Sequence, residues 1–449
     1  MSNIILNVDS YKLSHYKMYP SAMTEMTSYI EARSGGKWSE VVFFGLQMFL
    51  KEYLSKPITM YNVREAQRLA ELHGEPFNEE GWSIIVNEFN GYLPLEIQAI
   101  KEGTVVPTGV PVVQFRNTDP RFAWLPAYME TAMLRAVWYP CTVATNALMC
   151  RNIIEQYLYD TGCKDIGATA KFMLHDFGAR GSTSHESAGI GGAAHQMVFS
   201  GTDTIEGIVA LQKYYGADVE SFSIPAMDHS TVTTWTESME DDAFENAINQ
   251  YLTEGKILAC VIDSYDINRA VNAFCTKFKD RIMTSGGRCV LRPDSEDPII
   301  LCTSIAQQLM KSFGYTTNDA GYYVLPDCIR ILFGDGIDIT SLEKILENAK
   351  MNNIAAENFV FGMGGGLLQG VTRDTLRFAC KTNEVIVDGE RRLVFKKTPG
   401  KQSKAGRMAV DINTFEVTDE LTFTGKNALE IVYKNGLFYK DYVFKDIRL

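Results

Sequence analysis

A repeated pattern in the second half of the chain most constrains its fold. Short apolar runs end in polar or glycine residues and are followed by helical stretches; the runs cover 171–174, 257–262, 289–291, 329–333 and 359–361. Near-continuous apolar strands that alternate with helices are typical of a parallel sheet buried on both faces. Because polar or glycine residues follow the strands, the pattern predicts an α/β barrel whose active site lies at the carboxyl ends of the strands. A doubly wound open sheet is the alternative.

The two ends of the chain have a different, mixed pattern. Strands are expected at 27–30, 94–100 and 110–115, and helices at 40–54, 63–73, 80–90, 119–138 and 142–159, with Pro140 as a helix breaker. In the repeated region, helices are expected at 267–279, 300–313, 340–351 and 372–381. We therefore predict a mixed α/β domain over 1–165, a barrel over 166–380, and a C-terminal segment, 381–449, that returns to the mixed domain.

Composition narrows the possible functions. The chain has 449 residues and a net charge of −12, so it is a poor general binder of nucleic acid or anionic membranes, and any phosphate site must be local. Its nine cysteines include no C-x-x-C pair, and its six histidines form no H-E-x-x-H motif, so no metal site made from protein alone is expected. Scattered free thiols and the lack of a signal-like or membrane-spanning run lead us to expect a cytoplasmic protein.

Glycines follow the last two predicted strands. Gly334-Asp335-Gly336 and Gly364-Gly365-Gly366 would let backbone N–H groups approach an anion beside a helix N-terminus. The phosphate site of a barrel often lies after its seventh and eighth strands, which these would be in a complete barrel. For a single turn, a tight bend that needs glycine is the simpler explanation, but two consecutive turns favour phosphate binding.

Charged residues follow two other strands. Asp263 comes after one, and Arg292 and Asp294 come after the next. Carboxylates there suit ribose hydroxyls, and an arginine suits a phosphate or a substrate pocket. An internal salt bridge between Arg292 and Asp294 is the alternative.

The segment from His175 contains the other candidate polar residues. Phe177 and Arg180 follow the strand end, and the alternative is a loop capped by Ser182 or Ser184. Residues 189–194 match G-x-G-x-x-A, but no apolar strand precedes them, so we do not predict a dinucleotide site. From composition alone, His229 is a residue beside a helix cap and the lysine-rich loop 396–404 is a solvated surface.

Together, these blocks resemble the nicotinamide phosphoribosyltransferases of the type II phosphoribosyltransferase family. The resemblance runs from Asp9-Ser10-Tyr11-Lys12 almost to the C-terminus. Its specific blocks are 142–146, His175-Asp176-Phe177-Gly178, Gly201-Thr202-Asp203-Thr204, Asp263-Ser264-Tyr265-Asp266, Arg292-Pro293-Asp294-Ser295, 334–336 and 364–369. The resemblance implies an irregular α/β barrel with a second mixed α/β domain, and a homodimer with shared active sites. It implies that nicotinamide and phosphoribosyl pyrophosphate give nicotinamide mononucleotide and pyrophosphate.

The resemblance also implies residue roles. Phe177 and the Tyr11 of the other subunit should sandwich the pyridine ring, Asp203 should accept from the carboxamide, and Arg292 should lie beside the ring. Asp263 and Asp294 should hold the ribose hydroxyls. Gly334, Asp335, Gly364 and Gly365 should surround the 5′-phosphate. Pyrophosphate or ATP phosphates should be surrounded by Arg180, His229, Arg33, Arg373, Lys381, Lys396 and Lys401.

The implied chemistry uses ATP as a co-substrate and Mg²⁺ carried by the pyrophosphate. His229 matches the family's histidine that ATP phosphorylates, so the resemblance overrides the simpler interpretations of His229 and of the lysine loop. Ala379 and Asp228 depart from the family's usual residues near this step. The residues expected to act in catalysis are therefore His229, Asp263, Asp294 and Arg292.

Asp203 predicts nicotinamide as the substrate and nicotinate as the disfavoured alternative. Nicotinate would bring a second carboxylate to Asp203, which at about 4 Å and an effective dielectric constant near 20 costs about 4 kcal/mol. Nicotinate phosphoribosyltransferase, on the same fold, is the main alternative activity. A non-catalytic binding protein and a barrel glycoside hydrolase are the other classes; the complete charged rim disfavours the first and the glycine turns disfavour the second.

Overall fold

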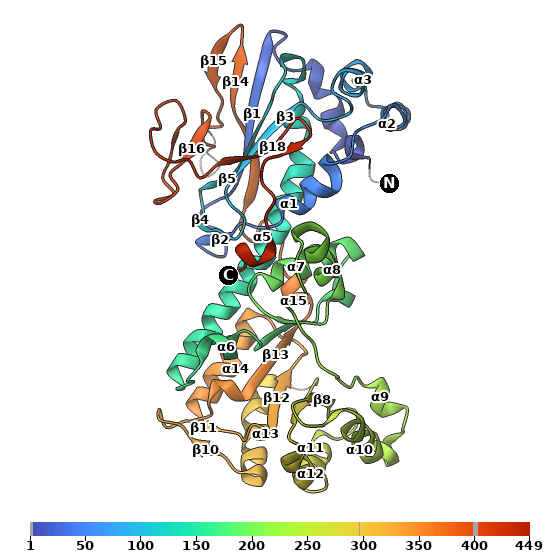
Figure 1. Cartoon of the computed structure of the whole chain (residues 1–449), viewed down its shortest axis with the longest axis vertical. Coiled ribbons are helices and arrows are strands. Elements are labelled where there is room, and N and C mark those ends of the chain that lie inside the picture. The colour runs from blue at the N-terminus through green and yellow to red at the C-terminus, as the bar shows by residue number, and fades with distance from the viewer. Residues whose placement is uncertain (1–2, 296, 398–402) are drawn as a thin grey trace. The chain divides into compact units, whose positions relative to one another are not determined.

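The computed structural model describes residues 3–295, 297–397 and 403–449. Contacts group the chain into two compact units (Figure 1): unit 1 is Met1–Thr145, Ala210–Ala217 and Val371–Leu449, and unit 2 is Asn146–Val209 and Asp218–Gly370. The two units therefore meet in the chain near residues 145 and 370, whereas the sequence pattern predicted domain boundaries near 165 and 380. Within the described ranges, none of the helices combines the length and apolar character needed to cross a membrane.

Unit 1 is built on an antiparallel sheet that joins both ends of the chain. Its strand order is β15 (Glu390–Leu393), β14 (Phe378–Val387), β1 (Met23–Ala32), β5 (Pro111–Asn117), β3 (Leu95–Ala99), β18 (Glu430–Lys434) and β19 (Leu437–Phe438). The long β1 pairs with both β5 and β14, so that Ala32 lies opposite Phe378. Two small two-stranded sheets accompany it, β2 (Glu40–Val42) with β4 (Val105–Pro107) and β16 (Met408–Val410) with β17 (Val417–Asp419).

Helices of unit 1 complete its apolar core. They are α1 (Leu46–Phe49), which continues as a π-helical turn at Leu50–Leu54, then α2 (Met60–His73), α3 (Glu79–Glu88), α4 (Leu125–Tyr128) and the first half of α5 (Glu130–Asp160). Helices were predicted correctly at 63–73 and 80–90, but Glu40–Val42 is a strand because it pairs with β4. Helix α5 also runs through Pro140 without ending there. Gly45, at φ 100°, leaves room for the Pro140 ring, since a Cβ at Gly45 would lie 2.5 Å from its Cγ.

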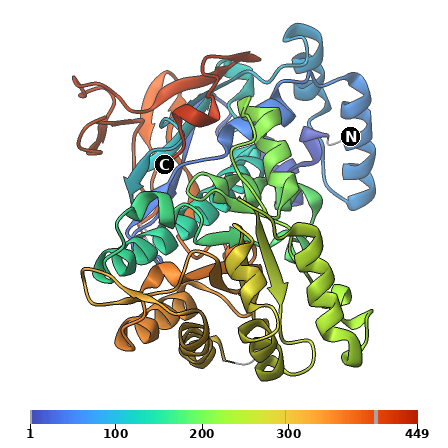
Figure 2. The ribbon, with the colours of Figure 1, turned by 60° about the horizontal axis from the view of Figure 1, so that its bottom comes forward.

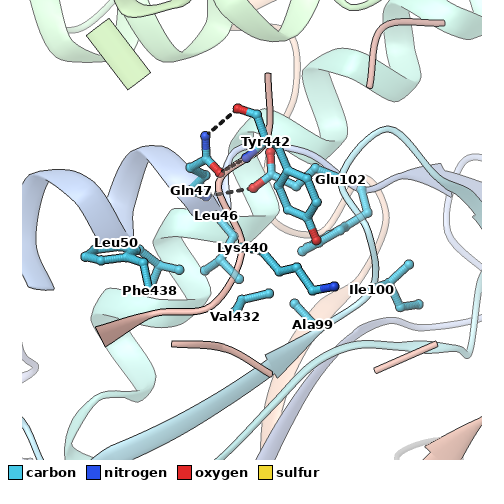
Figure 3. A pocket seen from close by; sticks show the side chains of 11 residues that line it. Leu46, Gln47, Leu50, Ala99, Ile100, Glu102, Val432, Phe438, Lys440 and Tyr442 are labelled. Atoms are coloured by element: carbon cyan, nitrogen blue, oxygen red, sulfur yellow. Dashed lines mark hydrogen bonds between the residues drawn. The ribbon is translucent and has the colours of Figure 1, made fainter. Parts of the chain in front are cut away.

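A small pocket in unit 1 surrounds a buried carboxylate (Figure 3). Glu102 accepts the backbone N–H groups of Gly45 and Gln47, at 3.0 and 2.7 Å, and the hydroxyl of Tyr215 at 2.6 Å. The Gln47 side chain in turn donates to the Tyr442 carbonyl at 2.9 Å and accepts from the Tyr442 N–H at 2.7 Å. Burial raises the pKa of Glu102. These bonds fasten the C-terminal segment to α1, and none of the predicted site residues that the structure describes lines the pocket.

Unit 2 contains a parallel sheet of six strands. Their order is β7 (Gly201–Thr202), β6 (Leu174–Asp176), β13 (Phe359–Met363), β12 (Ile329–Phe333), β9 (Arg288–Arg292) and β8 (Ile257–Val261). Every neighbouring pair in this sheet is parallel. Most of these strand residues are buried, as the continuous apolar runs predicted.

An irregular segment closes this sheet into a ring. Phe222 forms a parallel bridge with Gly201 on β7, and Ala226 forms another with Ala259 on β8. Backbone hydrogen bonds support both bridges: Phe222 N–H donates to Ser200 at 2.8 Å and Ala259 N–H donates to Pro225 at 3.0 Å. Residues 222–226 thus join the two edge strands. The closed arrangement agrees with the predicted irregular barrel, and in chain order β12 and β13 are its sixth and seventh members, not the seventh and eighth of a complete eight-stranded barrel.

Helices pack around the strands of unit 2 (Figures 1 and 2). Those after the later strands are α11 (Ile267–Cys275), α12 (Lys279–Thr284), α13 (Pro298–Phe313) and α14 (Ile339–Met351); the others in unit 2 are the second half of α5, α6 (Ile166–Ala170), α7 (His185–Gln196), most of α8 (Ile205–Tyr215) up to Val209, α9 (Ser230–Thr233), α10 (Glu240–Tyr251) and α15 (Gly365–Leu368). The short strands β10 (Thr316–Thr317) and β11 (Tyr323–Val324) form a separate pair. The helix expected at 372–381 is wrong, because Phe378 onward is strand β14.

Candidate active site

The carboxyl ends of the parallel strands bring most of the predicted site residues of unit 2 to one edge of the ring. Asp176 ends β6, Arg292 ends β9, and Asp203 directly follows β7. Gly334 and Gly364 directly follow β12 and β13. Because all these strands run in the same direction, their carboxyl ends open on the same side.

The Phe177 ring lies over the ends of β12 and β13. Its backbone N–H donates to the Met363 carbonyl at 3.0 Å, and its ring packs against the interior apolar cluster of Ala259, Val290 and Leu332. A Cβ at Gly362 would lie 2.0 Å from the Phe177 Cε2 atom, and one at Gly334 would lie 3.3 Å from it. Glycines at these two strand ends therefore make room for an aromatic ring at the mouth of the barrel.

The glycine turns differ in what surrounds them. A Cβ at Gly334 would also meet the Asp294 carboxylate at 3.2 Å, and one at Gly364 would meet the Phe177 carbonyl at 3.4 Å. A Cβ at Gly365, which begins α15, would have no atom of the described residues within 4 Å. Asp335 is exposed. Close packing thus explains part of the need for glycine at 334, while the open side of Gly365 leaves space for a ligand.

Asp176 and Asp203 stand side by side at the ends of β6 and β7. The Asp203 N–H donates to the Asp176 carbonyl at 2.9 Å, and the Asp176 carboxylate accepts the Gly178 N–H at 2.7 Å. Burial raises the pKa of Asp176 to about 6, and the neighbouring Asp203 adds to this rise. Asp203 itself is exposed, and its Oδ1 accepts the Ser223 hydroxyl at 2.5 Å. Neither Asp176 nor Ser223 was among the site residues expected from the sequence.

His175 precedes this pair. Its Nε2 lies 3.0 Å from the Phe172 carbonyl, so Nε2 carries the proton, and burial lowers the pKa of the ring. His175 is therefore a neutral neighbour of Asp203.

The charged residues after β8 and β9 form a second group. His229 Nε2 lies 3.2 Å from Asp263 Oδ1, and the Asp263 side chain is 2% exposed. Asp263 Oδ2 accepts the backbone N–H of Asp294 at 2.9 Å. Burial raises the pKa of Asp294, and the Asp263 and Asp335 carboxylates add to the rise, while Arg292 and His229 oppose it. The structure therefore brings His229, Asp263 and Asp294 together.

Arg292 takes part in the same group only loosely. Its Nη2 atom lies 3.8 Å from Asp294 Oδ2, so the internal salt bridge considered as an alternative is present, but it is long. The Arg292 Nε atom is buried and has no hydrogen-bond partner among the described residues. Donor capacity therefore remains for a bound anion or a polar substrate group.

His229 is the N-cap residue of the short helix α9 and makes no side-chain capping hydrogen bond, and Asp228 lies directly before it. The Asp228 carboxylate accepts from the Ser230 hydroxyl at 2.6 Å and from the Thr231 N–H at 3.2 Å, and the first of these bonds lowers the pKa of Asp228. A helix cap beside His229 was predicted; His229 itself occupies the N-cap position, and the side chain that bonds to the first turn is that of Asp228. The side chain of His229 is 46% exposed and contacts Asp263.

Two further sequence predictions concern α7 and Arg180. Ser184, not Ser182, is the N-cap of α7, where it forms a capping box with Ser187. The G-x-G-x-x-A run at 189–194 lies inside this helix, so it is no dinucleotide loop. Arg180 lies in a 3-10 helix, Ala179–Gly181, directly after Phe177 and Gly178, and is exposed.

The remaining predicted site residues belong to unit 1. Tyr11 is 55% exposed on the 3-10 helix Ser10–Leu13, with its ring 5.2 Å from that of His15. Arg33 follows β1, and its Nε and Nη2 atoms are buried without hydrogen-bond partners among the described residues. Arg373 contacts Asp374 at 3.0 Å, and Lys381 donates to the Cys380 carbonyl at 2.8 Å.

The lysine loop is described only in part. Lys396 is exposed, and its backbone N–H donates to the Ser403 hydroxyl at 3.0 Å, whereas Lys401 lies outside the described residues. Lys404 was not among the expected site residues. It forms an ion pair with the buried Glu31, and its backbone N–H donates to the Tyr29 hydroxyl at 2.9 Å. Arg33 lies 3.8 Å from the same Glu31. Within the described ranges, no three metal-ligating side chains gather into a cluster that could hold a metal ion.

Comparisons with known proteins agree with this arrangement. The model of the nicotinate phosphoribosyltransferase (NAPRTase) family matches residues 172–437, and that of the N-terminal domain of nicotinamide phosphoribosyltransferase matches residues 3–97. A protein of Xanthomonas campestris pv. campestris (strain 8004), named nicotinamide phosphoribosyltransferase, is 42% identical over 100% of this chain and 98% of its own length. The chain belongs to the family of nicotinamide and nicotinate phosphoribosyltransferases. It is an enzyme of the pentosyltransferase class, as the sequence resemblance implied.

Other phosphoribosyltransferases extend the comparison. A nicotinamide phosphoribosyltransferase of Acinetobacter baylyi (strain ATCC 33305 / BD413 / ADP1) is 30% identical over 96% of this chain and 93% of its own. Nicotinate-nucleotide pyrophosphorylase from Pyrococcus furiosus matches the fold with a TM-score of 0.63, at 15% identity over 99% of this chain and 94% of its own. Human nicotinic acid phosphoribosyltransferase matches with a TM-score of 0.57, at 14% identity over 98% and 91%. These structural matches confirm the predicted fold class.

Proposed function

We propose that this enzyme transfers the phosphoribosyl group of phosphoribosyl pyrophosphate to nicotinamide, giving nicotinamide mononucleotide and pyrophosphate, a salvage step toward NAD. The choice of nicotinamide over nicotinate depends on the position of Asp203. Its N–H donates to the carbonyl of Asp176 at 2.9 Å, and Asp176 ends the strand that leads into Phe177. The 42% identical relative, which is named for nicotinamide, supports the same choice.

Two aromatic faces and one hydrogen-bond acceptor are proposed to hold the pyridine ring. Phe177 offers its face, with Tyr11 of a second subunit proposed on the other side, and Asp203 accepts from the carboxamide NH₂. A carboxylate in place of the amide would meet Asp203 with a repulsion of about 4 kcal/mol at about 4 Å and an effective dielectric constant near 20. Nicotinate is therefore the disfavoured substrate, and nicotinate phosphoribosyltransferase remains the alternative activity.

The transfer step needs charge stabilisation more than proton transfer. Pyrophosphate leaves with negative charge and C1 of the ribose becomes oxocarbenium-like, while the pyridine nitrogen is unprotonated at neutral pH and needs no general base. Asp263 and Asp294 are proposed to hold the ribose hydroxyls, with Arg292 beside them. The glycine turns with Asp335 are proposed to receive the 5′-phosphate through backbone N–H groups.

Mg²⁺ is proposed to arrive on the pyrophosphate. Asp294 and Asp335 fit such a complex, because their carboxylates supply the oxygen ligands that Mg²⁺ prefers. Among the described residues, these ligands are too few to hold the ion without the pyrophosphate. When bound, the ion neutralises charge that develops on the leaving group. The cations that complete the pyrophosphate and ATP site are proposed to be Arg180, Arg33, Arg373, Lys381, Lys396 and Lys401.

ATP coupling is proposed to pass through His229. Because Asp263 contacts Nε2, Nδ1 is the nitrogen that we expect to accept a phosphoryl group. The buried carboxylate then stabilises the positive charge that the ring acquires. We also infer a homodimer with shared sites and a cytoplasmic location; the nine free cysteines support the latter.

The test is product formation by the purified protein with phosphoribosyl pyrophosphate, Mg²⁺ and either nicotinamide or nicotinate, with and without ATP. Mononucleotide from nicotinamide alone is the expected result, with stimulation by ATP. Turnover of nicotinate in its place would overturn the role given to Asp203. An Asp203→Asn variant should lose the preference for nicotinamide, and an unchanged preference would contradict the charge argument.

A further inference from the structure

The segment that closes the barrel also contacts the proposed ring site. Phe222 forms its parallel bridge with Gly201, and the Thr202 N–H donates to the Phe222 carbonyl at 3.1 Å. The next residue of the segment, Ser223, thereby lies beside the residue that follows β7, Asp203. The hydroxyl of Ser223 lies 2.5 Å from Asp203 Oδ1.

The direction of this hydrogen bond is fixed by chemistry. An ionised carboxylate can only accept, so the single hydrogen of the Ser223 hydroxyl points at Asp203. Its oxygen can then only accept from any other group. Among the described residues, Asp203 Oδ2 has no hydrogen-bond partner, so the pair presents two acceptor atoms, the serine oxygen and Oδ2, to a molecule that lies beside it.

The neighbouring groups do not provide a competing donor. The N–H of the His175 ring is directed at the Phe172 carbonyl at 3.0 Å, and burial lowers the pKa of that ring, so it stays neutral. Asp176 contacts Asp203 through the main chain, and its carboxylate accepts the Gly178 N–H. Ser223 is therefore the side chain that fixes the rotation of the Asp203 carboxylate.

We infer that Ser223 is a positioning residue for substrate selection: with its hydrogen committed to Asp203, the pair forms a double acceptor that reads the two N–H donors of a carboxamide and offers none to a carboxylate. This inference rests on the proposed function and deepens it. It assigns selectivity to the geometry of the pair as well as to the charge of Asp203. The carboxamide of nicotinamide can donate to both acceptors, whereas the carboxylate of nicotinate would place its own acceptor oxygens against them.

The experiment is steady-state kinetics of Ser223→Ala, Ser223→Thr and the matched control Ser221→Ala. Ser221 lies two residues earlier, and its hydroxyl is buried without a hydrogen-bond partner among the described residues. For Ser223→Ala we expect kcat/KM for nicotinamide to fall roughly tenfold, since a hydrogen bond to a charged group is lost. KM for phosphoribosyl pyrophosphate should stay unchanged, and the ratio of nicotinamide to nicotinate turnover should fall.

Two comparisons separate this role from a merely structural one. Ser223→Thr keeps the hydroxyl and should restore most of the selectivity, and Ser221→Ala should behave like the unmodified enzyme. In an Asp203→Ala background, Ser223→Ala should change the nicotinamide kinetics less than about twofold, because the pair no longer exists. Thermal unfolding of each variant checks that it folds.

The opposite results are equally clear. The inference is overturned if Ser223→Ala leaves selectivity intact, raises KM for both substrates alike, or keeps its full effect in the Asp203→Ala background. If the unmodified enzyme turns over no nicotinamide, the proposed function itself fails. If the unmodified enzyme is active and only the Ser223 variants disagree, the role of Ser223 alone is wrong.

Discussion

The Nε2 atom of His229 lies 3.2 Å from Oδ1 of Asp263, and the other oxygen of that carboxylate accepts the backbone N–H of Asp294. The two partners differ in exposure, since the side chain of His229 is 46% exposed and that of Asp263 is 2% exposed. A buried carboxylate thus aligns an accessible imidazole and also fixes the turn after β9. The two residues should therefore respond differently to substitution.

His229→Ala should abolish stimulation by ATP and preserve phosphoribosyl transfer without ATP. Asp263→Asn should impair both, because it weakens the alignment of His229 and the turn that carries Asp294. Loss of a hydrogen bond to a charged group predicts a fall of roughly 10- to 100-fold in ATP-independent kcat/KM for Asp263→Asn. Initial rates with and without ATP measure both effects. A His229→Ala enzyme that ATP still stimulates would show that coupling does not use this histidine.

Gly362→Ala should damage the ring site through packing. The added Cβ would lie 2.0 Å from the Phe177 ring, so the ring must move. Overpacking of this kind costs about 1–3 kcal/mol, and the displaced ring should also raise KM for nicotinamide. Gly167→Ala is the matched control, because nothing lies within 4 Å of its added Cβ in α6. Equal thermal stability and equal KM in the two variants would contradict the proposed contact.

Asp176 predicts a pH dependence of stability. Burial raises its pKa from 3.8 to about 6, so the folded state holds a proton that the unfolded state has already lost between these values. The contribution of Asp176 to the unfolding free energy is therefore complete below pH 3.8 and is lost as the pH rises through about 6. The shift corresponds to about 3 kcal/mol.

Asp176→Asn removes this titration and keeps an acceptor for the Gly178 N–H. Relative to the variant, the unmodified protein should lose about 3 kcal/mol of unfolding free energy between about pH 4 and about pH 7. Urea unfolding of both proteins across that range measures the difference. Parallel pH profiles would mean that Asp176 ionises freely in the folded state.

The sequence pattern predicted the barrel strands at 257–262, 289–291, 329–333 and 359–361, because burial on both faces requires apolar residues. The strand expected at 171–174 was wrong except at Leu174, since residues 171–173 form a turn and β6 runs over Leu174–Asp176. The pattern also failed where distant pairing decides the structure. Residues 372–381 have the composition of a helix, yet Phe378 begins a strand because it pairs with Ala32, far away in the chain. Pro140 was expected to end a helix, but Gly45 accommodates its ring and the helix continues.

The candidate site was predictable to a different extent. Strand ends alone pointed to Asp263, Arg292 and the glycine turns, whereas the roles of His229 and Tyr11 required the resemblance to a known family. Ser223 could not be found in either way, since its bond to Asp203 exists only because an irregular segment containing Pro225 closes the ring. Lys404 likewise becomes visible only through its ion pair with the buried Glu31.

Shared active sites predict complementation between two inactive variants. Tyr11 is 55% exposed in unit 1, and its proposed partner across the ring is the Phe177 of the other subunit. Tyr11→Ala and Phe177→Ala should each be nearly inactive, because each lacks one face of the stacked ring. A mixed dimer contains one site with both faces and one site with neither. Random mixing should therefore recover about a quarter of the unmodified activity.

Two controls make this outcome specific. Tyr61→Ala removes another exposed tyrosine, 71% exposed on α2, and should leave activity intact. A chain that carries both Tyr11→Ala and Phe177→Ala should restore nothing to either single variant, since no combination then contains an intact site. Activity is measured after dissociation and reassociation, with mixed dimers verified by two affinity tags. No recovery in verified mixed dimers would mean that both ring faces come from a single subunit, because each dimer would then hold two damaged sites.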